Sequence, residues 1–442
     1  KNDLTSVIKG ATITADGTVS ANTRDYRTGN AISGFESLLE RSDTGVESFI
    51  STDGTDYYDV DASNDTETTS TPLKDQVKNG ALIVTGAMAI SAADNAAGAA
   101  VVINDITNTF HSKIDSSTIT AGTIKSDAQA ASFLVTAAGG AAVSTKNGAG
   151  GGSVVWNGIS NDVKAGALNS TLTAKTINAK ALNGIRMISV AGGSVSYNKI
   201  QTTNSAFIDG GAVITAADNI GVVAQTDDTL MNYAGVLAIG GTAGVGAAVA
   251  INYILGDTKA YIDSATLKAA GTAGGVTVNN AISDDKMNSG FISDQSVNIL
   301  YTLENQRTST TKTGIVVDSS ATHTMKSFVA NAAGAGSVAL AGTVNVNQID
   351  GNTNAYIKNA TLNLGATPGD VSVNAADYTN CSGFVGSVGG AGTIGIGASS
   401  DTNKVRRNTS AKLEDIKTGS LAKAAVVYAV AKQGLSSVAA GL

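Results

Sequence analysis

Short alternations of apolar and polar residues, separated by Gly, Asn, Asp and Thr, run through most of the chain. In VAINYILGDTKAYI, residues 249–262, Val249 and Ile251 come before a polar segment and Tyr261 or Ile262 continues the pattern after it. The alternation resumes at Val276 and Val278. Alternation with a period of two predicts short strands joined by turns. Helical spacing appears only weakly, at residues 420–433. The chain is therefore predicted to be all-β.

One of these alternating stretches recurs six times, as N-x-[IV]-x5-A or a close variant. The repeated asparagines are Asn104, Asn157, Asn198, Asn252, Asn347 and Asn403. Successive copies are separated by 53, 41, 54, 95 and 56 residues, so four spacings lie near one period. The spacing of 95 contains one period and roughly forty extra residues. A fixed period of this size is the mark of a solenoid or another repeat array.

The repeat predicts a right-handed parallel β-helix with about two coils per 53–56-residue repeat and two protruding insertions, since two coils of ~25 residues fit one unit. Inward Ile, Val, Leu and Ala would stack between coils and form a continuous core. Each repeated Asn is expected inward at a turn, where its amide would bond to neighbouring coils as in a stacked amide ladder. The polar residues between Asn and Ala are expected to form turns that face water.

The domain organisation follows from the phase of the repeat. Residues 1–22 match the tail of a truncated repeat, and residues 23–80 form a first insertion. Repeats of the β-helix follow at 81–281, a second insertion at 282–330, and further repeats at 331–442. Because 331–442 stops in the middle of a unit, both ends are expected to cut a repeat of a longer protein.

Composition narrows the class of partner. The 442 residues carry a net charge of −7, which does not favour a nucleic-acid partner. The single Cys381 excludes an intrachain disulfide framework and a thiolate metal cluster. The apolar runs are too short and too rich in Ala and Gly to span a membrane. Membrane attachment is therefore expected only through parts of the protein outside this segment.

Three motifs together carry a resemblance to a known family. The pattern N-x-[IV]-x5-A-[YF]-I-x-x-A-T-[LV], the following G-x-V-x-V-x-A, and tracts such as GSVGGAG at 386–392 resemble the passenger regions of type V-secreted autotransporter adhesins and haemagglutinin- or leukotoxin-like surface proteins of Gram-negative anaerobes. The resemblance covers residues 81–280, 331–442 and the tail at 1–22. It implies secretion to the bacterial cell surface, a β-helical stalk, and binding to glycans or proteins of host cells or of other bacteria.

The two insertions hold the candidate partner-binding residues, because loops on a repeat scaffold often carry the binding face. The aromatic candidates are Tyr26, Phe35, Phe49, Tyr57, Tyr58, Phe291 and Tyr301. These rings could instead only fasten each insertion to the rod. The acidic run Asp53–Asp65 could gather oxygen ligands for Ca²⁺, but Asn64 stands where a calcium loop needs Gly and Ser70 where it needs Glu. A solvated acidic loop is the favoured interpretation.

The remaining residues do not indicate an enzyme. His111 and His323 belong to no metal or catalytic motif and are interpreted as surface or turn residues, while Trp156 is interpreted as packing and Cys381 as buried or free. No catalytic, cofactor-binding or metal-binding residue is therefore assigned. The leading hypothesis is an adhesin stalk. The alternative is a structural spacer or filament-forming stalk without a binding site, and a polysaccharide-acting enzyme or a toxin passenger is favoured less.

Overall fold

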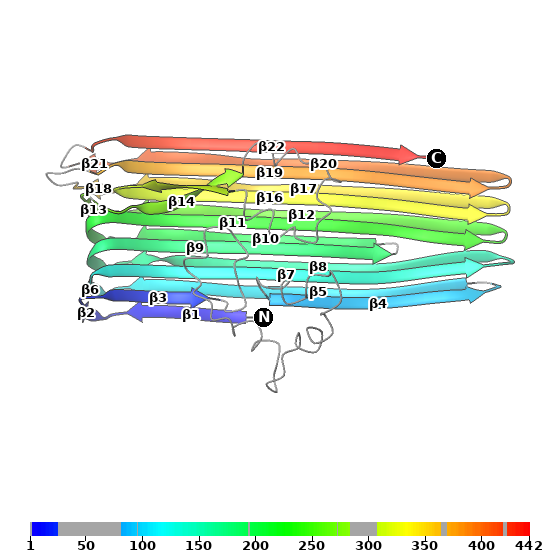
Figure 1. Cartoon of the computed structure of the whole chain (residues 1–442), viewed down its shortest axis with the longest axis horizontal. Helices are drawn as coiled ribbons and strands as arrows, with labels where there is room; N and C mark the ends of the chain where they lie inside the picture. Colours follow the sequence, from blue (N-terminus) through cyan, green and yellow to red (C-terminus); the bar gives the residue numbers. More distant parts are fainter. Residues whose placement is uncertain are drawn as a thin grey trace, which may run out of the picture.

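The chain folds into two long parallel sheets that lie face to face, with one short antiparallel pair of strands beside them (Figure 1). The computed structural model describes residues 2–24, 81–94, 96–192, 195–271, 273–282, 307–363, 369–418 and 422–442. Within these residues, sheet A has seven strands and sheet B has thirteen. The all-β class and the parallel β-helix are confirmed.

The strands of each sheet lie side by side in the order in which the coils follow one another. Sheet A contains β1 (Asn2–Lys9), β5 (Ala96–Asp115), β8 (Gly148–Leu168), β10 (Val195–Asp209), β12 (Ala243–Asp263), β17 (Val338–Lys358) and β20 (Ile394–Glu414). Sheet B contains β2 (Thr12–Thr14), β3 (Thr18–Arg24), β4 (Ala81–Ala93), β6 (Thr118–Thr120), β7 (Thr123–Ser144), β9 (Thr171–Gly192), β11 (Val213–Gly240), β13 (Thr266–Ala269), β16 (Ile315–Ala335), β18 (Thr361–Leu362), β19 (Val371–Ala391), β21 (Lys417–Thr418) and β22 (Ala425–Gly441). The antiparallel pair is β14 (Val276–Ile282) with β15 (Arg307–Lys312).

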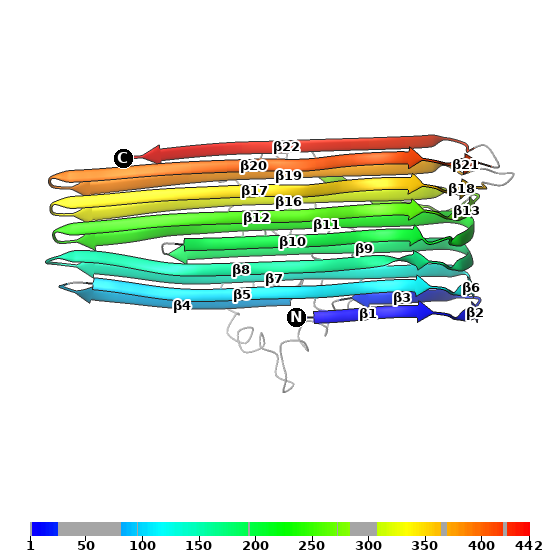
Figure 2. The same ribbon diagram turned by 180° about the vertical axis from the view of Figure 1, so that it is seen from behind.

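Each coil crosses sheet B, turns back through sheet A, and rises to the next level. In Figure 1 the sheet B strands run from left to right in front, and Figure 2 shows the sheet A strands from behind. This winding is right-handed, as parallel crossovers almost always are.

One sequence repeat makes one coil, so the expectation of about two coils per repeat is wrong. Asn104 pairs with Asn157, which is the same position one repeat later, and Asn347 likewise pairs with Asn403. A coil consists mainly of two strands of about twenty residues, such as the 21 residues of β12. At about 3.3 Å per residue such a strand is about 70 Å long. Each coil is therefore a long, flat rung.

The polar segment in the middle of each repeat is strand, not turn. In β12 every second residue from Gly244 to Ile262 is buried, and the alternation continues without a break through Gly256 and Thr258. The inward polar groups find partners inside the rung: the Thr258 hydroxyl lies 2.7 Å from the Thr226 hydroxyl of sheet B. Because these groups are satisfied in the interior, the strand does not need to end where the sequence becomes polar.

The six repeated asparagines form a continuous ladder inside the rod. Each side-chain amide donates to the side-chain oxygen of the next Asn, from Asn104 to Asn157, Asn198, Asn252, Asn347 and Asn403, at distances of 2.8, 2.8, 2.9, 2.8 and 2.7 Å. Asn157 and Asn252 are fully buried. The ladder lies in the middle of the sheet A strands and not at a turn, because each Asn sits within a continuous strand.

A left-handed residue makes the corner from sheet A to sheet B in each described coil, and at Gly210 a second one, Gly211 with φ 81°, follows it. The corner residues are Gly10, Ser116, Asn169, Gly210, Ser264, Asn359 and Asp415, with φ values of 61, 49, 49, 71, 51, 49 and 53°. Gly and short polar residues adopt this backbone conformation most readily. The corners therefore repeat a conformation even though the residue changes.

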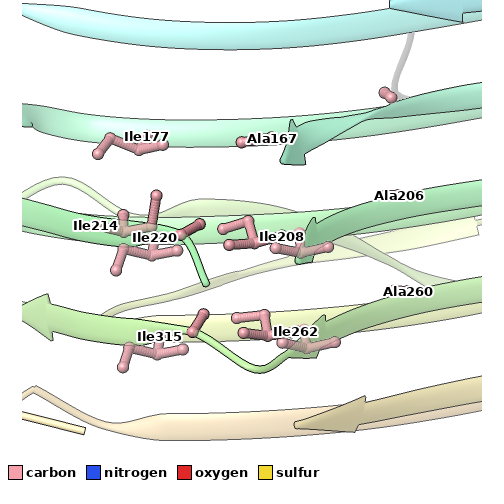
Figure 3. Close-up of a cluster of buried hydrophobic side chains, with 14 of the residues drawn as sticks. Ala167, Ile177, Ala206, Ile208, Ile214, Ile220, Ala260, Ile262 and Ile315 are labelled. Atoms are coloured by element: carbon pink, nitrogen blue, oxygen red, sulfur yellow. The ribbon is translucent and has the colours of Figure 1, made fainter. Parts of the chain in front are cut away.

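The apolar core is continuous from coil to coil. Beside the corners, Ile208, Ile214 and Ile220 pack against the equivalent Ile262 and Ile315 of the next coil (Figure 3). In the middle of the rungs, the repeat residues Ile159, Ile200, Ile254 and Ile349 form a second fully buried cluster. Small residues such as Ala138, Ala248 and Ala250 form the core toward the far turns. Large apolar side chains therefore fill the rod near the corners and in the middle of the rungs, and smaller ones fill it toward the far turns.

Two irregular spacings have structural explanations. The 41-residue coil is short because β9 ends at Gly192 and β10 begins at Val195, so β8 pairs directly with β12 where β10 is absent. In the 95-residue coil, residues 315–330 do not belong to the second insertion as expected. They lie in β16, where Ile315 pairs with Ile220 of β11 and with Val371 of β19. Residues 274–281, at the end of the range 81–281 that was assigned to the β-helix repeats, instead lie largely in β14, which pairs with β15.

Candidate functional site

The seven aromatic candidates of the insertions, and the acidic run Asp53–Asp65, lie outside the described residues. These candidates are Tyr26, Phe35, Phe49, Tyr57, Tyr58, Phe291 and Tyr301. Their assignment stays a prediction. The structure does describe the strands from which both insertions depart.

The first insertion interrupts a single rung of sheet B. β3 and β4 both pair with β7: Arg24 lies opposite Gln129, and Ala81 lies opposite Ser132. Only the positions opposite Ala130 and Ala131 separate the two strands. Residues 25–80 therefore leave a rung and return to it almost where they left.

The second insertion also starts on sheet B. Its first strand, β14, places Val276 against the outer face of the sheet, where it packs with Val223 of β11 and Val316 of β16. Along the strands, Val223 occupies the same register as Lys180 of β9 and Asp127 of β7. Asp127 is only a few residues from Gln129 and Ser132, where the first insertion departs. The strand ends that flank both insertions therefore lie along the same stretch of sheet B.

Sheet B is buried on both faces along this stretch. In β11 the residues that point outward are covered as well as those that point inward, from Ile220 to Asn232. An outward ion pair joins Arg186 to Asp227 at 3.1 Å, with side chains 5% and 2% exposed. A strand with one face in the core and one face in water would show every second residue exposed. Here every residue is buried, so this stretch of the outer face of sheet B is covered.

The interior also holds a charged network that the sequence did not predict. Arg407 donates to Asp377 at 2.7 Å and to the Thr353 hydroxyl at 3.0 Å, and both charged side chains are fully buried. Burial alone would raise the pKa of Asp377, but the Arg407 guanidinium holds it below its usual value. His323 lies 3.4 Å from Asp228 and is also fully buried.

Glycine makes room for this network. A Cβ on Gly256 would come within 2.7 Å of the His323 ring, and one on Gly351 would meet the Arg407 guanidinium. The network is sealed from solvent, which indicates a structural role. His323 is therefore wrongly interpreted from sequence as a surface or turn residue.

His111 lies on the outer surface, which is one of the two expected places, but in a strand and not in a turn. It points outward near the end of β5, where its ring lies 2.9 Å from Asp162, which also accepts a hydrogen bond from Lys164. Cys381 is buried and free, and burial raises the pKa of its thiol to about 12. Within the described ranges, no group of three or more His, Cys, Asp and Glu side chains could hold a metal ion.

Comparisons with known proteins returned nothing. No family model, curated protein or solved structure matches the chain. The part of the chain that the structure describes also contains no helix that is long and apolar enough to cross a bilayer.

A row of aromatic side chains on the outer face of sheet A was missed by the sequence analysis. Trp156 is 49% exposed and stacks on Tyr197 with a centroid distance of 4.2 Å, and Tyr197 contacts Tyr253 at 5.9 Å. Burial, followed by the charge of Tyr253, raises the pKa of Tyr197. The interpretation of Trp156 as packing is therefore incomplete. A signal was present: Asn157 points inward, so its neighbour on a strand must point outward.

A second row lies nearer the corners. Phe207, Tyr261 and Tyr356 stack on successive strands at 5.8 and 5.2 Å, and the Lys259 ammonium lies 4.0 Å from the Tyr261 ring. Burial and nearby acidic side chains raise the pKa of Tyr261. Gly166 leaves space for this row, since a Cβ there would meet the Phe207 ring. The rings of this row are largely buried and Tyr261 contacts the Lys259 ammonium, whereas Trp156 in the first row is half exposed.

Proposed function

We propose that this chain is part of a cell-surface adhesin of a Gram-negative bacterium, in which a stiff β-helical stalk carries its two insertions to a receptor. The receptor is a glycan or a protein on a host cell or on another bacterium. The resemblance to type V-secreted passengers belongs to this proposal. It assigns no catalytic residue and no cofactor, and it places any membrane anchor outside this segment.

One observation carries the proposal. Both insertions depart from the same stretch of sheet B, while the rungs beneath them continue in register. A stack of hydrogen-bonded rungs is a stiff support, and segments that leave such a support on one face are well placed to reach a partner together.

The alternative is a spacer that only sets the distance between other parts of the protein. What favours it is the uniformity of the rungs, whose interior is the same ladder and core from coil to coil. Such an array forms a stiff rod whether or not it carries a binding site.

The decisive experiment removes the first insertion without disturbing its rung. Replacing residues 25–80 by two Ala residues fills the positions opposite Ala130 and Ala131 and joins β3 to β4 in register. A matched variant replaces residues 283–306 by Asn-Gly, a two-residue turn suited to the antiparallel β14–β15 pair. Both variants should keep the far-UV circular dichroism of the parent chain.

Binding is then measured on glycan arrays and on intact epithelial and bacterial cells. We expect the parent chain to bind and the variant without residues 25–80 to lose at least tenfold in affinity. Loss in the second variant alone would move the site to the second insertion. Undiminished binding by both variants, or no binding by the parent chain, would refute adhesion through the insertions and leave the spacer.

A further inference from the structure

The outer face of sheet A is divided into a charged half near the corners and an uncharged half near the far turns. The dividing line is the ladder of inward asparagines. On the corner side, the first outward column contains Asp105, Lys199 and Lys404. On the other side, the first two outward columns are apolar through five strands: Ile103, Trp156, Tyr197, Ile251 and Val346, and then Val101, Val154, Val195, Val249 and Val344.

The apolar surface continues toward the far turns without a charged side chain. The next two outward columns contain Ala99, Gly152, Ala247, Gly342 and Ala398, and then Gly150, Val245, Leu340 and Ile396. We call these four columns the apolar half-face. Ile103 is 70% exposed, Val101 59% and Val245 53%. An exposed apolar region of this extent marks an interaction site.

Three of the four outward columns in this half of the rod carry mostly large side chains, whereas most residues that point inward from the same strands are small. The residues that point inward from the same strands include Ala100, Ala248 and Ala250, which are buried. The two sheets approach so closely that a Cβ on Gly140 of β7 would collide with the backbone of Gly152 in β8. The chain therefore cannot turn the outward residues into its own core, and another surface must cover them to remove them from water.

The aromatic row indicates the kind of surface. Trp156 and Tyr197 stack face against face, with an angle of 22° between their planes. A sugar ring would need a free aromatic face, but here each ring uses a face on its neighbour along the rod. What the row offers outward is a ridge of ring edges, which suits packing against another sheet.

We propose that the apolar half-face binds the apolar half-face of a second copy of this chain. A two-fold axis parallel to the direction of stacking would lay Trp156 of one copy over the groove that Gly150 and Gly152 leave on β8 of the other. Trp156 and the two glycines lie on the same strand, so each copy offers both and the contact is made twice. This is the self-complementarity that a two-fold interface requires.

The groove is a feature of the isolated chain. A Cβ on Gly150 would meet no atom within 4 Å, so the packing of one copy does not require Gly there. Beside Gly150 and Gly152 there is also no residue of β10, because that strand begins at Val195 opposite Val154. The groove is therefore the strip of β8 without side chains at Gly150 and Gly152, next to the stretch where β12 pairs directly with β8.

The area is sufficient for a stable pair. Four outward columns span about 27 Å along the strands, and five strands span about 24 Å across them, which gives about 650 Å² of flat area before the side chains are considered. Stable interfaces bury about 600–1,000 Å² of accessible surface per partner, and the accessible area of a corrugated surface exceeds its flat projection. Pairing through sheet A would leave the outer face of sheet B, and the strand ends that flank both insertions, outside the interface on each copy.

The test uses the full chain and three single variants. Ile103→Lys places a charge within the half-face, and Gly150→Trp fills the groove with an apolar side chain. Thr107→Lys, on the same strand and the same outer face but in the charged half, is the matched control. Self-association is measured by sedimentation equilibrium from roughly 1 to 100 µM, a range that reports micromolar dissociation constants. Flotation with phosphatidylcholine vesicles tests lipid as the other apolar partner, and far-UV circular dichroism checks folding.

We expect the parent chain and Thr107→Lys to dimerise alike, and both other variants to weaken the dimer at least tenfold. Gly150→Trp is the most discriminating variant. Its larger apolar surface would strengthen adsorption to lipid or unspecific aggregation, but its side chain would obstruct a shape-matched pair. Any one of four results would overturn the proposal. The parent chain could stay monomeric throughout, or Ile103→Lys could leave the dimer unaffected. Gly150→Trp could associate more strongly, or the parent chain could float with the vesicles. None of these results depends on receptor binding, so the pairing and the adhesin proposal can fail separately.

Discussion

Breaking the asparagine ladder in its middle is expected to cost much more stability than removing its last member. The side chain of Asn198 accepts a hydrogen bond from Asn157 at 2.8 Å and donates to Asn252 at 2.9 Å, and all three residues are fully buried. Asn198→Ala would therefore leave the Asn157 donor and the Asn252 acceptor without these partners in the interior. The Ser196 hydroxyl, which also accepts from Asn198, would keep its hydrogen bond to Asn232.

The magnitude follows from these two orphaned groups. A buried polar group that loses its partner costs about 1–3 kcal/mol, so Asn198→Ala should lower the free energy of unfolding by about 2–6 kcal/mol. Asn403 ends the described ladder and accepts from Asn347 at 2.7 Å in a partly exposed setting. Since water can replace that acceptor, Asn403→Ala should cost only about 1 kcal/mol.

Guanidinium unfolding followed by far-UV circular dichroism gives the comparison, as the midpoint shift multiplied by the slope. Amide hydrogen exchange read by mass spectrometry would locate the loss in β8, β10 and β12 for Asn198→Ala. Equal costs for the two variants, or a cost below about 1 kcal/mol for Asn198→Ala, would show that the amide ladder does not hold the rungs together.

Three further outcomes follow from the interior. Gly351→Ala should destabilise the chain strongly, because its φ is 138° and a Cβ would meet Arg407, whereas Gly342→Ala on the same strand meets no atom and should be neutral in thermal melts. Arg407→Met should cost about 3–5 kcal/mol by leaving Asp377 buried without its partner. The lowered pKa of Asp377 contributes stability that is present above its unfolded pKa of about 3.9 and is lost as the pH falls through the folded value, so denaturation midpoints measured across acidic pH should lose part of this dependence in Arg407→Met. Cys381, with a pKa of about 12, should resist iodoacetamide at pH 8 until the chain unfolds, and labelling of the folded chain within minutes would contradict its burial.

The sequence was sufficient for the phase of the repeat and for the residues that point inward. Asn252 and Ile254 recur because each must fit its equivalents in the coils on either side, and that constraint is visible as a period. The length of the coil was not predictable in the same way. Gly256 and Thr258 point inward from a strand, but the same residue types are also typical of turns. Only the partners in the facing sheet distinguish an inward strand residue from a turn residue.

The second insertion shows another limit. Residues 274–281 and 314–320 both have the composition of the strand that follows the corner, and register with β11 decides between them. The buried pair of Arg407 and Asp377 depends on the space above Gly256 and Gly351, which belong to other coils. Contacts between residues of different coils therefore could not be predicted from the order of residues along the sequence. By contrast, the outward direction of Trp156 followed from Asn157 and could have been predicted.

The break between β3 and β4 gives the rod a modular character. The two strand ends lie three register positions apart on β7, which is about 10 Å. A folded head whose own termini are that close could be exchanged for another at this point without altering the pitch or the number of rungs. Exchange of the domain inserted here would let such a protein change what it presents while the rod stays the same. The break between β3 and β4 is also a defined site for grafting unrelated domains.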